Sequence, residues 1–279
     1  GNITRNEFGM HMKPGSLYVD VVKCPLENAA SKSDIESYSF PDPYAIGRFE
    51  KARRDIDKYG DRYFVIGDVE ISLFEMAWHL TGLEKYMIGM LCNEPWLEPL
   101  NDLVEEWSTG LALQLVKAGV DAIWLGEDLG SQTSTLIAPD DWRIKFKPRH
   151  QRMIETLRRE NPDLIVIMHS DGAVAPLIDD FIEIGIDVYN PVQPNVAGSD
   201  PQELKNRYGD KICFFGGIDQ QSLLPSGDIG MIREEIKRRI SILGKNRGYL
   251  LAPAHILQPD VTTETIEEMI KAAIEFGIY

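Results

Sequence analysis

The sequence predicts an α/β protein of the (β/α)8 TIM-barrel type. Six short apolar runs alternate with longer amphipathic segments after residue 61, which is the pattern of repeating strand–helix units. The runs are almost continuously apolar, as expected of parallel strands that are covered on both faces. A length of 279 residues suits one barrel. Because a closed barrel needs eight strands, an open doubly wound sheet is the alternative architecture.

The N-terminal part differs from the repeats. Apolar runs at Phe8–His11 and Leu17–Val22 flank a Pro-Gly turn and predict a β-hairpin. The polar stretch 24–43 predicts mostly loop, and helical spacing predicts an exposed helix over Tyr44–Tyr59. We therefore expect one domain over residues 1–279, composed of a lead-in over 1–60 and βα repeats over 61–279.

The repeat region predicts strands and helices that alternate along the chain. The predicted strands are Tyr63–Gly67, Ala122–Gly126, Leu164–Met168, Val188–Tyr189, Ile212–Phe215 and Tyr249–Ala252. The predicted helices are Leu73–Leu80, Glu84–Cys92, Glu98–Ala118, Asp140–Glu160, Ala175–Ile184, Gln202–Tyr208, Ile229–Leu243 and Thr263–Phe276. Gly82, Gly119 and Gly185 follow helical patterns and predict helix C-caps. Ala118–Asp121 and Ile184–Asp187 read as the same helix-to-strand turn used twice.

Charge and composition exclude several classes of partner. The net charge of −15 disfavours nucleic acid and anionic membranes. No apolar run reaches the roughly 18 residues that span a bilayer. The three cysteines show no CxxC spacing and predict reduced thiols. We therefore expect a cytoplasmic protein that acts on a small-molecule substrate.

Polar residues follow every predicted strand. The C-terminal ends of parallel barrel strands share one face, where active sites lie. Asp68 follows the first strand, Gln132 the second, and Asn190 and Gln193 the fourth. We interpret these four as candidate substrate-binding residues.

The segment His169-Ser170-Asp171-Gly172 follows the third strand. Alternate residues of an extended chain point the same way, so His169 and Asp171 could offer a nitrogen and an oxygen to one ion. His255, which follows the last strand, is the candidate third ligand. Catalytic zinc sites commonly have three such protein ligands and one open position. The alternative is a hydrogen-bonded pair that holds no metal.

Acidic side chains at two other strand ends are the catalytic candidates. Glu127 and Asp128 form a pair after the second strand, where one could act as a general acid or base. Asp219 follows the fifth strand. The alternative for the pair is a loop-capping role in solvent. His150 lies in a basic stretch and is expected on a solvated helix face.

Six motifs in order resemble the uroporphyrinogen decarboxylase superfamily, from about Phe8 to the C-terminus. They are Glu127–Gln132, Leu136–Arg143, His169–Gly172, Asp187–Gln193, Phe215–Asp219 and Ala252–His255. The resemblance implies a (β/α)8 barrel. It also implies that the family's usual N-terminal segment, which carries the first barrel elements, is lacking from this chain.

One branch of this superfamily consists of corrinoid-linked methyltransferases, which hold zinc with an H-x-C pair and a later Cys. His169 matches the His, Asp171 stands in place of the first Cys, and His255 lies near the place of the second. The resemblance therefore implies a metal-assisted methyltransferase with zinc and a corrinoid carried by a partner protein. These harder ligands favour methyl transfer from O-methyl compounds, or between a corrinoid protein and a pterin, over thiol activation.

Two alternative functions remain. The first is decarboxylation of a tetrapyrrole, in which Asp68, Asp128 or Asp219 would hold the pyrrole nitrogens. The sequence lacks the arginine-rich N-terminal motif that true decarboxylases use to bind the substrate carboxylates. The second is a barrel with a degenerate site that only binds a small molecule.

Overall fold

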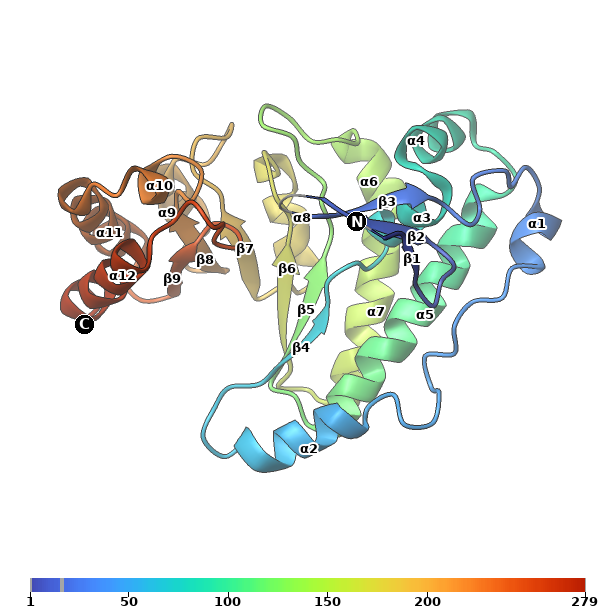
Figure 1. Ribbon diagram of the computed structural model, residues 1–279, viewed down its shortest axis with the longest axis horizontal. Helices are drawn as coiled ribbons and strands as arrows, with labels where there is room; N and C mark the ends of the chain where they lie inside the picture. Colours follow the sequence, from blue (N-terminus) through green and yellow to red (C-terminus); the bar gives the residue numbers. More distant parts are fainter. Residues whose placement is uncertain (1, 16–17, 279) are drawn as a thin grey trace. The chain divides into compact units, whose positions relative to one another are not determined.

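The computed structural model describes residues 2–15 and 18–278, and Figure 1 shows its elements in chain order. The chain forms two compact units. The first comprises Gly1–Glu127 and Pro148–Leu164, and the second comprises Asp128–Lys147 and Ile165–Tyr279. Each unit thus takes residues from two separate parts of the sequence. The single barrel domain expected over residues 1–279 stays a prediction.

The first unit begins with a small antiparallel sheet of order β1-β2-β3. Its strands are β1 Thr4–Arg5, β2 His11–Pro14 and β3 Val19–Lys23. The predicted hairpin corresponds to β2 and β3, and residues 16 and 17 of its turn and second strand lie outside the described residues. The prediction was wrong for the earlier strand of the hairpin, because β2 begins at His11 and includes Pro14, which was expected in the turn. Phe8 is instead buried, with its ring centroid 4.9 Å from that of Trp107.

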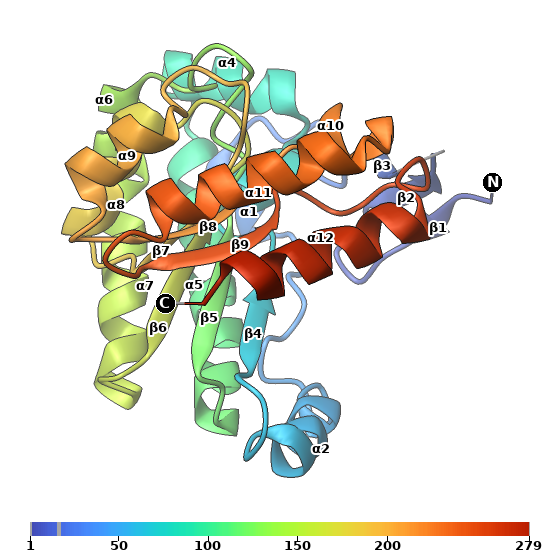
Figure 2. The ribbon, with the colours of Figure 1, turned by 90° about the vertical axis from the view of Figure 1, so that its left-hand side faces the viewer.

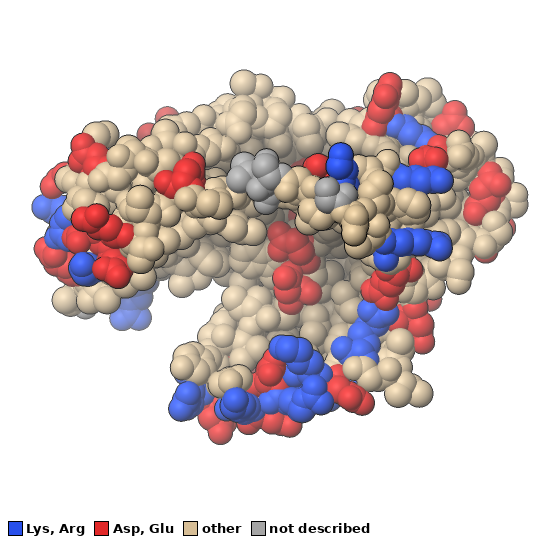
Figure 3. Space-filling model, in the orientation of Figure 1, with Lys and Arg blue, Asp and Glu red and all other residues tan. Residues whose placement is uncertain are grey.

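The first unit also contains helices of very different lengths. They are α1 Lys32–Glu36, α2 Glu50–Tyr59, α3 Phe74–Thr81, α4 Leu83–Cys92, α5 Leu97–Ala118 and α7 Lys147–Glu160. The short helix α1 lies in the stretch expected to be loop, and α2 begins six residues later than predicted. Figure 3 shows that α2 mixes both signs of charge, as an exposed helix does.

The helix predicted over Asp140–Glu160 is two helices, α6 Pro139–Lys145 and α7. Pro148 has no backbone N–H to continue the first helix, so the chain restarts there. Helices α5 and α7 lie alongside each other (Figure 1). They are joined by Arg149, whose guanidinium lies 2.6–2.7 Å from the carboxylates of Glu98, Asp102 and Glu105.

All six predicted parallel strands are present. The first, predicted over Tyr63–Gly67, begins three residues later, at Ile66, and includes Asp68, which was expected to follow it. In the first unit β4 Ile66–Val69 pairs with β5 Ala122–Gly126. In the second unit the order is β6-β7-β8-β9. Their bounds are β6 Ile165–His169, β7 Val188–Val192, β8 Cys213–Ile218 and β9 Tyr249–Pro253. Within the described residues the structure has these six parallel strands, and closure into an eight-stranded barrel stays a prediction.

Helices of the second unit cover its sheet. They are α6, the 3-10 turn η1 Ala175–Leu177, α8 Ile178–Glu183, α9 Pro201–Tyr208, α10 Leu223–Ser226, α11 Ile229–Leu243 and α12 Thr263–Phe276. Helices α11 and α12 lie side by side (Figure 2). Their apolar faces bury Ile232, Ile236 and Met269 against Ile218 of β8. None of the helices in the described parts is long and apolar enough to cross a membrane.

The repeated helix-to-strand turn has one hydrogen-bond pattern in both places. Asp121 accepts a hydrogen bond from the N–H of Val65 at 2.6 Å and donates its own N–H to the Val65 carbonyl at 2.8 Å. Asp187 does the same with Val166, at 2.7 and 2.9 Å. Each aspartate therefore joins the start of its own strand to the start of the preceding one.

Candidate metal centre

The structure brings His169, Asp171 and His255 together in the second unit. His169 is the last residue of β6, Asp171 follows two residues later, and His255 follows β9 by two residues. Each offers one ligand atom, and these three atoms lie within 4.8 Å of one another. His255 Nε2 is 3.5 Å from an oxygen of Asp171. The C-terminal ends of the parallel strands lie at one edge of the sheet, and the residues at the ends of β6 and β9 meet across that edge although β7 and β8 lie between the two strands.

Asn190 of β7 orients the first histidine. Its side-chain oxygen is 2.7 Å from His169 Nδ1. A carbonyl oxygen only accepts, so this contact is a hydrogen bond when Nδ1 carries the proton. In the neutral ring, Nε2 then keeps its lone pair. Both side chains are buried, with 8% of His169 and 5% of Asn190 exposed.

The backbone around Asp171 is held by several neighbours. Ser170 accepts the N–H of Leu129 at 3.0 Å, and Gly172 donates its N–H to the side-chain oxygen of Gln193 at 2.7 Å. Gly130 passes so close that a Cβ there would lie 2.5 Å from the Asp171 carbonyl oxygen. Only a glycine fits this approach, and it leaves the Asp171 backbone little freedom.

Asp128 is the acidic neighbour of this cluster. One of its oxygens accepts the backbone N–H of Asp171 at 3.2 Å and lies 3.9 Å from His169 Nε2. The Asp128 side chain is 44% exposed, so it has access to solvent. Burial raises the pKa of the Asp171 carboxyl, and the negative charge of Asp128 raises it further, while His169 and His255 oppose the rise.

The donor set fits a divalent transition metal. Ligands at about 2.0–2.2 Å from one ion in a tetrahedral site lie about 3.4 Å apart. The His255–Asp171 separation of 3.5 Å already matches this spacing, and the full cluster needs only small side-chain movements. Two imidazoles and one carboxylate are a common donor set for zinc and other first-row metals.

Glu127 lies in a different environment from Asp128. It is fully buried in the first unit, and its carboxylate accepts hydrogen bonds from the Ser72 hydroxyl and from the three backbone N–H groups of Leu73, Phe74 and Glu75. These N–H groups belong to the start of α3, where the helix dipole favours a negative charge. This geometry supports an anchoring role, and the catalytic role predicted for Glu127 stays untested.

His150 contradicts its predicted exposure. It is fully buried, and its Nε2 lies 3.2 Å from Glu127. The basic residues around it suggested a solvated face, but α7 turns this position inward, toward a carboxylate 23 residues earlier in the chain. No sequence pattern joins the two positions, so only the fold could show the pair.

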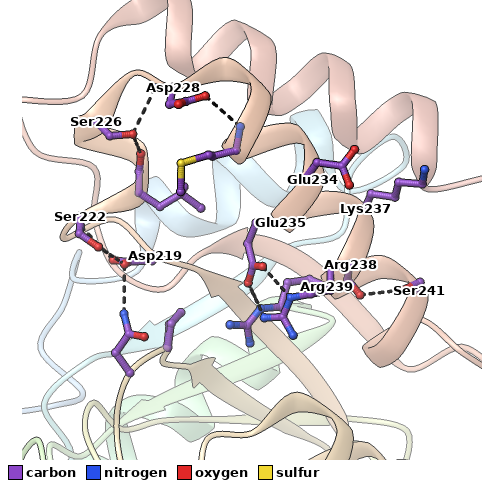
Figure 4. Close-up of a pocket in the computed structure, with 14 residues that line it drawn as sticks. Asp219, Ser222, Ser226, Asp228, Glu234, Glu235, Lys237, Arg238, Arg239 and Ser241 are labelled. Atoms are coloured by element: carbon purple, nitrogen blue, oxygen red, sulfur yellow. Dashed lines mark hydrogen bonds and ion pairs between the residues drawn. The ribbon is translucent and has the colours of Figure 1, made fainter.

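Asp219 lies apart from the metal donors. It lines a cavity of about 1130 Å³ together with Asn195, Glu235, Arg238 and Arg239, and none of the three donors lines this cavity. Asp219 and Ser222 point toward each other, and Glu235 accepts hydrogen bonds from both arginines (Figure 4). Burial raises the pKa of Asp219, but hydrogen bonds from Ser222 and from nearby backbone N–H groups outweigh it and lower the pKa overall.

The four predicted substrate-binding residues fall into two pairs. The side-chain oxygens of Asn190 and Gln193 contact the segment His169–Gly172, which we call the candidate metal-ligand segment. Gln132 is exposed, and Asp68 occupies an exposed position of β4 in the first unit. Substrate contact by any of the four stays a prediction. From the sequence, Asn190 and Gln193 were predicted only to follow a strand. Their contacts depend on the register in which β6 pairs with β7, which the sequence does not show.

Parallel strands that alternate with helices define an α/β fold, with polar residues at the strand ends. A family model described as uroporphyrinogen decarboxylase (URO-D) matches residues 7–276. The chain therefore belongs to the uroporphyrinogen decarboxylase family, and the resemblance drawn from the sequence is confirmed.

Individual relatives agree with this assignment. The uroporphyrinogen decarboxylase of Methylococcus capsulatus is 26% identical over 264 residues, which cover 91% of this chain and 71% of the relative. That of Prochlorococcus marinus is 23% identical over 208 residues, covering 73% of this chain and 57% of the relative. A methyltransferase from Methanosarcina mazei shares the fold, with a TM-score of 0.76 at 20% identity, over 97% of this chain and 77% of that one.

Proposed function

We propose that this protein is a metal-assisted methyltransferase of the uroporphyrinogen decarboxylase family. The observation that carries the proposal is the cluster of His169, Asp171 and His255, whose ligand atoms lie within 4.8 Å of one another. Family membership and the shared fold with a methyltransferase support it. The alternative reaction, decarboxylation of a tetrapyrrole, needs no metal. A metal centre would therefore favour methyl transfer over decarboxylation.

The residues of the cluster have separable roles. His169, Asp171 and His255 would hold the ion, and zinc suits their donors. The bound ion would supply Lewis acidity, which stabilises the deprotonated form of a methyl acceptor. Asp128 is open to solvent 3.9 Å from His169 Nε2. It is therefore placed to take up the proton that the acceptor loses.

The ligands also limit the substrate. Without thiolates the centre is harder than one built from cysteines, and it favours oxygen and nitrogen groups. We therefore propose O-methyl compounds or a pterin as the small-molecule partner, with the methyl group passed to or from a corrinoid held by a partner protein.

Metal content is the first test. Elemental analysis of the purified protein is expected to give about one zinc per chain, and His169→Ala and His255→Ala are each expected to lose it. His11→Ala is the matched control, since His11 lies on β2 of the first unit. Wild-type protein that is free of metal, after purification without chelators and incubation with zinc, would contradict the proposal.

Methyl transfer is the second test. The zinc-loaded protein is offered methylcobalamin with a panel of pterin, phenol and thiol acceptors, and cob(I)alamin with O-methyl donors. Transfer that disappears in His169→Ala would support the proposed reaction. Transfer that persists unchanged in both histidine variants would show that the cluster is not the centre.

A second candidate is decarboxylation of a tetrapyrrole. It is favoured by the two relatives named uroporphyrinogen decarboxylase and by Asp219, whose lowered pKa keeps it charged beside a large cavity. This candidate predicts porphyrinogen binding that Asp219→Asn weakens at least tenfold while metal content stays unchanged. A lack of porphyrinogen binding, measured anaerobically by fluorescence, would remove it.

A further inference from the structure

We infer that Asn190 is a positioning residue that selects the Nδ1–H tautomer of His169 and thereby presents its Nε2 to the donor cluster. The inference deepens the proposed function and rests on it for its effect on metal binding. The tautomer itself is a property of the metal-free protein and is tested separately.

The geometry of one short hydrogen bond carries the first step. His169 Nδ1 and the side-chain oxygen of Asn190 are 2.7 Å apart, which is a full-strength hydrogen bond. The two residues are direct neighbours in the parallel pairing of β6 and β7. Their side chains therefore emerge beside each other from two paired strands, and their contact does not depend on a mobile loop.

Burial makes this hydrogen bond selective. With 5% of Asn190 and 8% of His169 exposed, water has little access to replace the acceptor. A buried N–H without a partner is strongly disfavoured. The alternative tautomer would turn the Nδ1 lone pair toward the Asn190 oxygen and lose the bond. The fold therefore favours the Nδ1–H form.

The other ring nitrogen, Nε2, lies on the side of Asp128, the acidic neighbour of the cluster. Nε2 is the atom near Asp128, at 3.9 Å, and the rings of His169 and His255 are 6.1 Å apart. A metal ligand must offer a lone pair, and the partner of its second nitrogen determines which nitrogen does so. Asn190 thus prepares His169 to bind before any ion arrives.

A second amide of the same segment acts on the backbone. Gln193 accepts the N–H of Gly172, the residue after Asp171. The oxygens of Asn190 and Gln193 therefore hold the candidate metal-ligand segment at both ends. Both amides are buried, Asn190 within β7 and Gln193 directly after it.

The first experiment reads the tautomer in the metal-free protein. ¹⁵N NMR with histidine-selective labelling distinguishes protonated from unprotonated ring nitrogens, and His169→Gln assigns the signals. We expect Nδ1–H for His169 in the wild type and in Asn190→Asp, whose carboxylate still accepts. Asn190→Leu is expected to shift His169 toward Nε2–H. An Nε2–H form in the wild type would overturn the inference.

The second experiment measures zinc affinity by competition with a chromogenic chelator. Loss of a hydrogen-bond partner of a metal-binding histidine typically costs about 10–100-fold in affinity. We expect that loss in Asn190→Leu and an affinity within about threefold of the wild type in Asn190→Asp. Asn101→Leu is the control, because Asn101 is a buried amide that bonds Tyr86 in the first unit.

The outcomes separate the two proposals. If Asn190→Leu keeps the Nδ1–H form, or weakens zinc binding no more than Asn101→Leu does, the inference is wrong. If Asn190→Leu does not fold, the inference is decided by the tautomer of His169 in the wild type and by the tautomer and zinc affinity of Asn190→Asp. If the wild type binds no zinc but shows the Nδ1–H form lost in Asn190→Leu, the inference holds and the proposed metal function fails.

Discussion

At the residue scale, two adjacent acids have opposite environments. Glu127 is completely buried at the start of α3 beside His150, whereas Asp128 is 44% exposed beside the metal donors. The sequence presents them as a pair, but successive residues at a strand end point in opposite directions. We therefore expect Glu127 to anchor the start of α3, and the proposed chemical role belongs to Asp128.

Substitution of the buried acid should cost stability. Glu127→Gln removes the charge that four donors and His150 surround, so we expect the free energy of unfolding to fall by about 2–3 kcal/mol. Urea denaturation measures this change. Glu106→Gln, an exposed position of α5, is the control and should change stability by less than about 0.5 kcal/mol. Equal stability of the two variants would contradict the anchoring role.

Metal binding should depend on pH through Asp171. Its pKa is raised above the ordinary value of 3.8, so protons compete with a metal at higher pH than at an exposed aspartate. Because the carboxylate is the binding form, affinity should fall as the pH is lowered through that raised pKa. Zinc titrations between pH 4 and 8 measure this. Asp171→Asn should bind zinc more weakly, and one fewer proton should compete with the zinc. If the dependence of zinc affinity on pH is the same in Asp171→Asn as in the wild type, Asp171 is not a ligand.

At the scale of elements, the repeated turn shows how a local pattern has a nonlocal effect. Asp121 and Asp187 each accept a backbone N–H from the preceding strand, at 2.6 and 2.7 Å. The glycine two residues before each aspartate ends the helix with a positive φ, of 100° at Gly119 and 91° at Gly185. The turn therefore ends a helix and aligns two strands at once.

The strand-aligning aspartate can be tested directly. Asp187→Ala leaves the Val166 N–H without its side-chain acceptor and should cost about 1–2 kcal/mol of unfolding free energy. Asp187→Asn keeps an acceptor oxygen and should recover most of the loss. Thermal and urea unfolding of both variants give the comparison. The control is Asp163→Ala, at an exposed position before β6, and a loss as large in that variant would show that the hydrogen bond is not the cause.

At the scale of the whole molecule, the two units are interleaved in sequence. The first unit needs residues 148–164, because α7 supplies the His150 that meets Glu127 and the Arg149 that meets three carboxylates of α5. It also contributes Met153, Ile154 and Leu157 to the buried core. No single cut in the chain therefore separates the units.

Truncation tests this interdependence. A fragment of residues 1–127 lacks α7, leaves the carboxylates of Glu98 and Glu105 without Arg149, and should show no cooperative unfolding. A fragment of residues 1–164 retains these contacts and should regain a cooperative transition. Circular dichroism during urea denaturation compares the two. Cooperative unfolding of the shorter fragment would show that the first unit does not depend on α7.

The sequence alone determined much of the architecture. Period and composition identified all six parallel strands and most helices, because burial on both faces and helical amphipathicity leave local signals. The order of motifs identified the family. The positions of His169, Asp171 and His255 after predicted strands also indicated that these residues would meet, since the strand ends of a parallel sheet share one edge.

Only the tertiary structure decided what each polar side chain contacts. His169 and Gly172 contact Asn190 and Gln193, each 21 residues away in sequence, and Glu127 contacts His150, 23 residues away, as well as Ser72 to Glu75. Contacts of this kind depend on strand register and on the rotation of a helix, and neither follows from local propensity. A buried polar group must find a partner, but the sequence does not say which one, because the choice is made by packing.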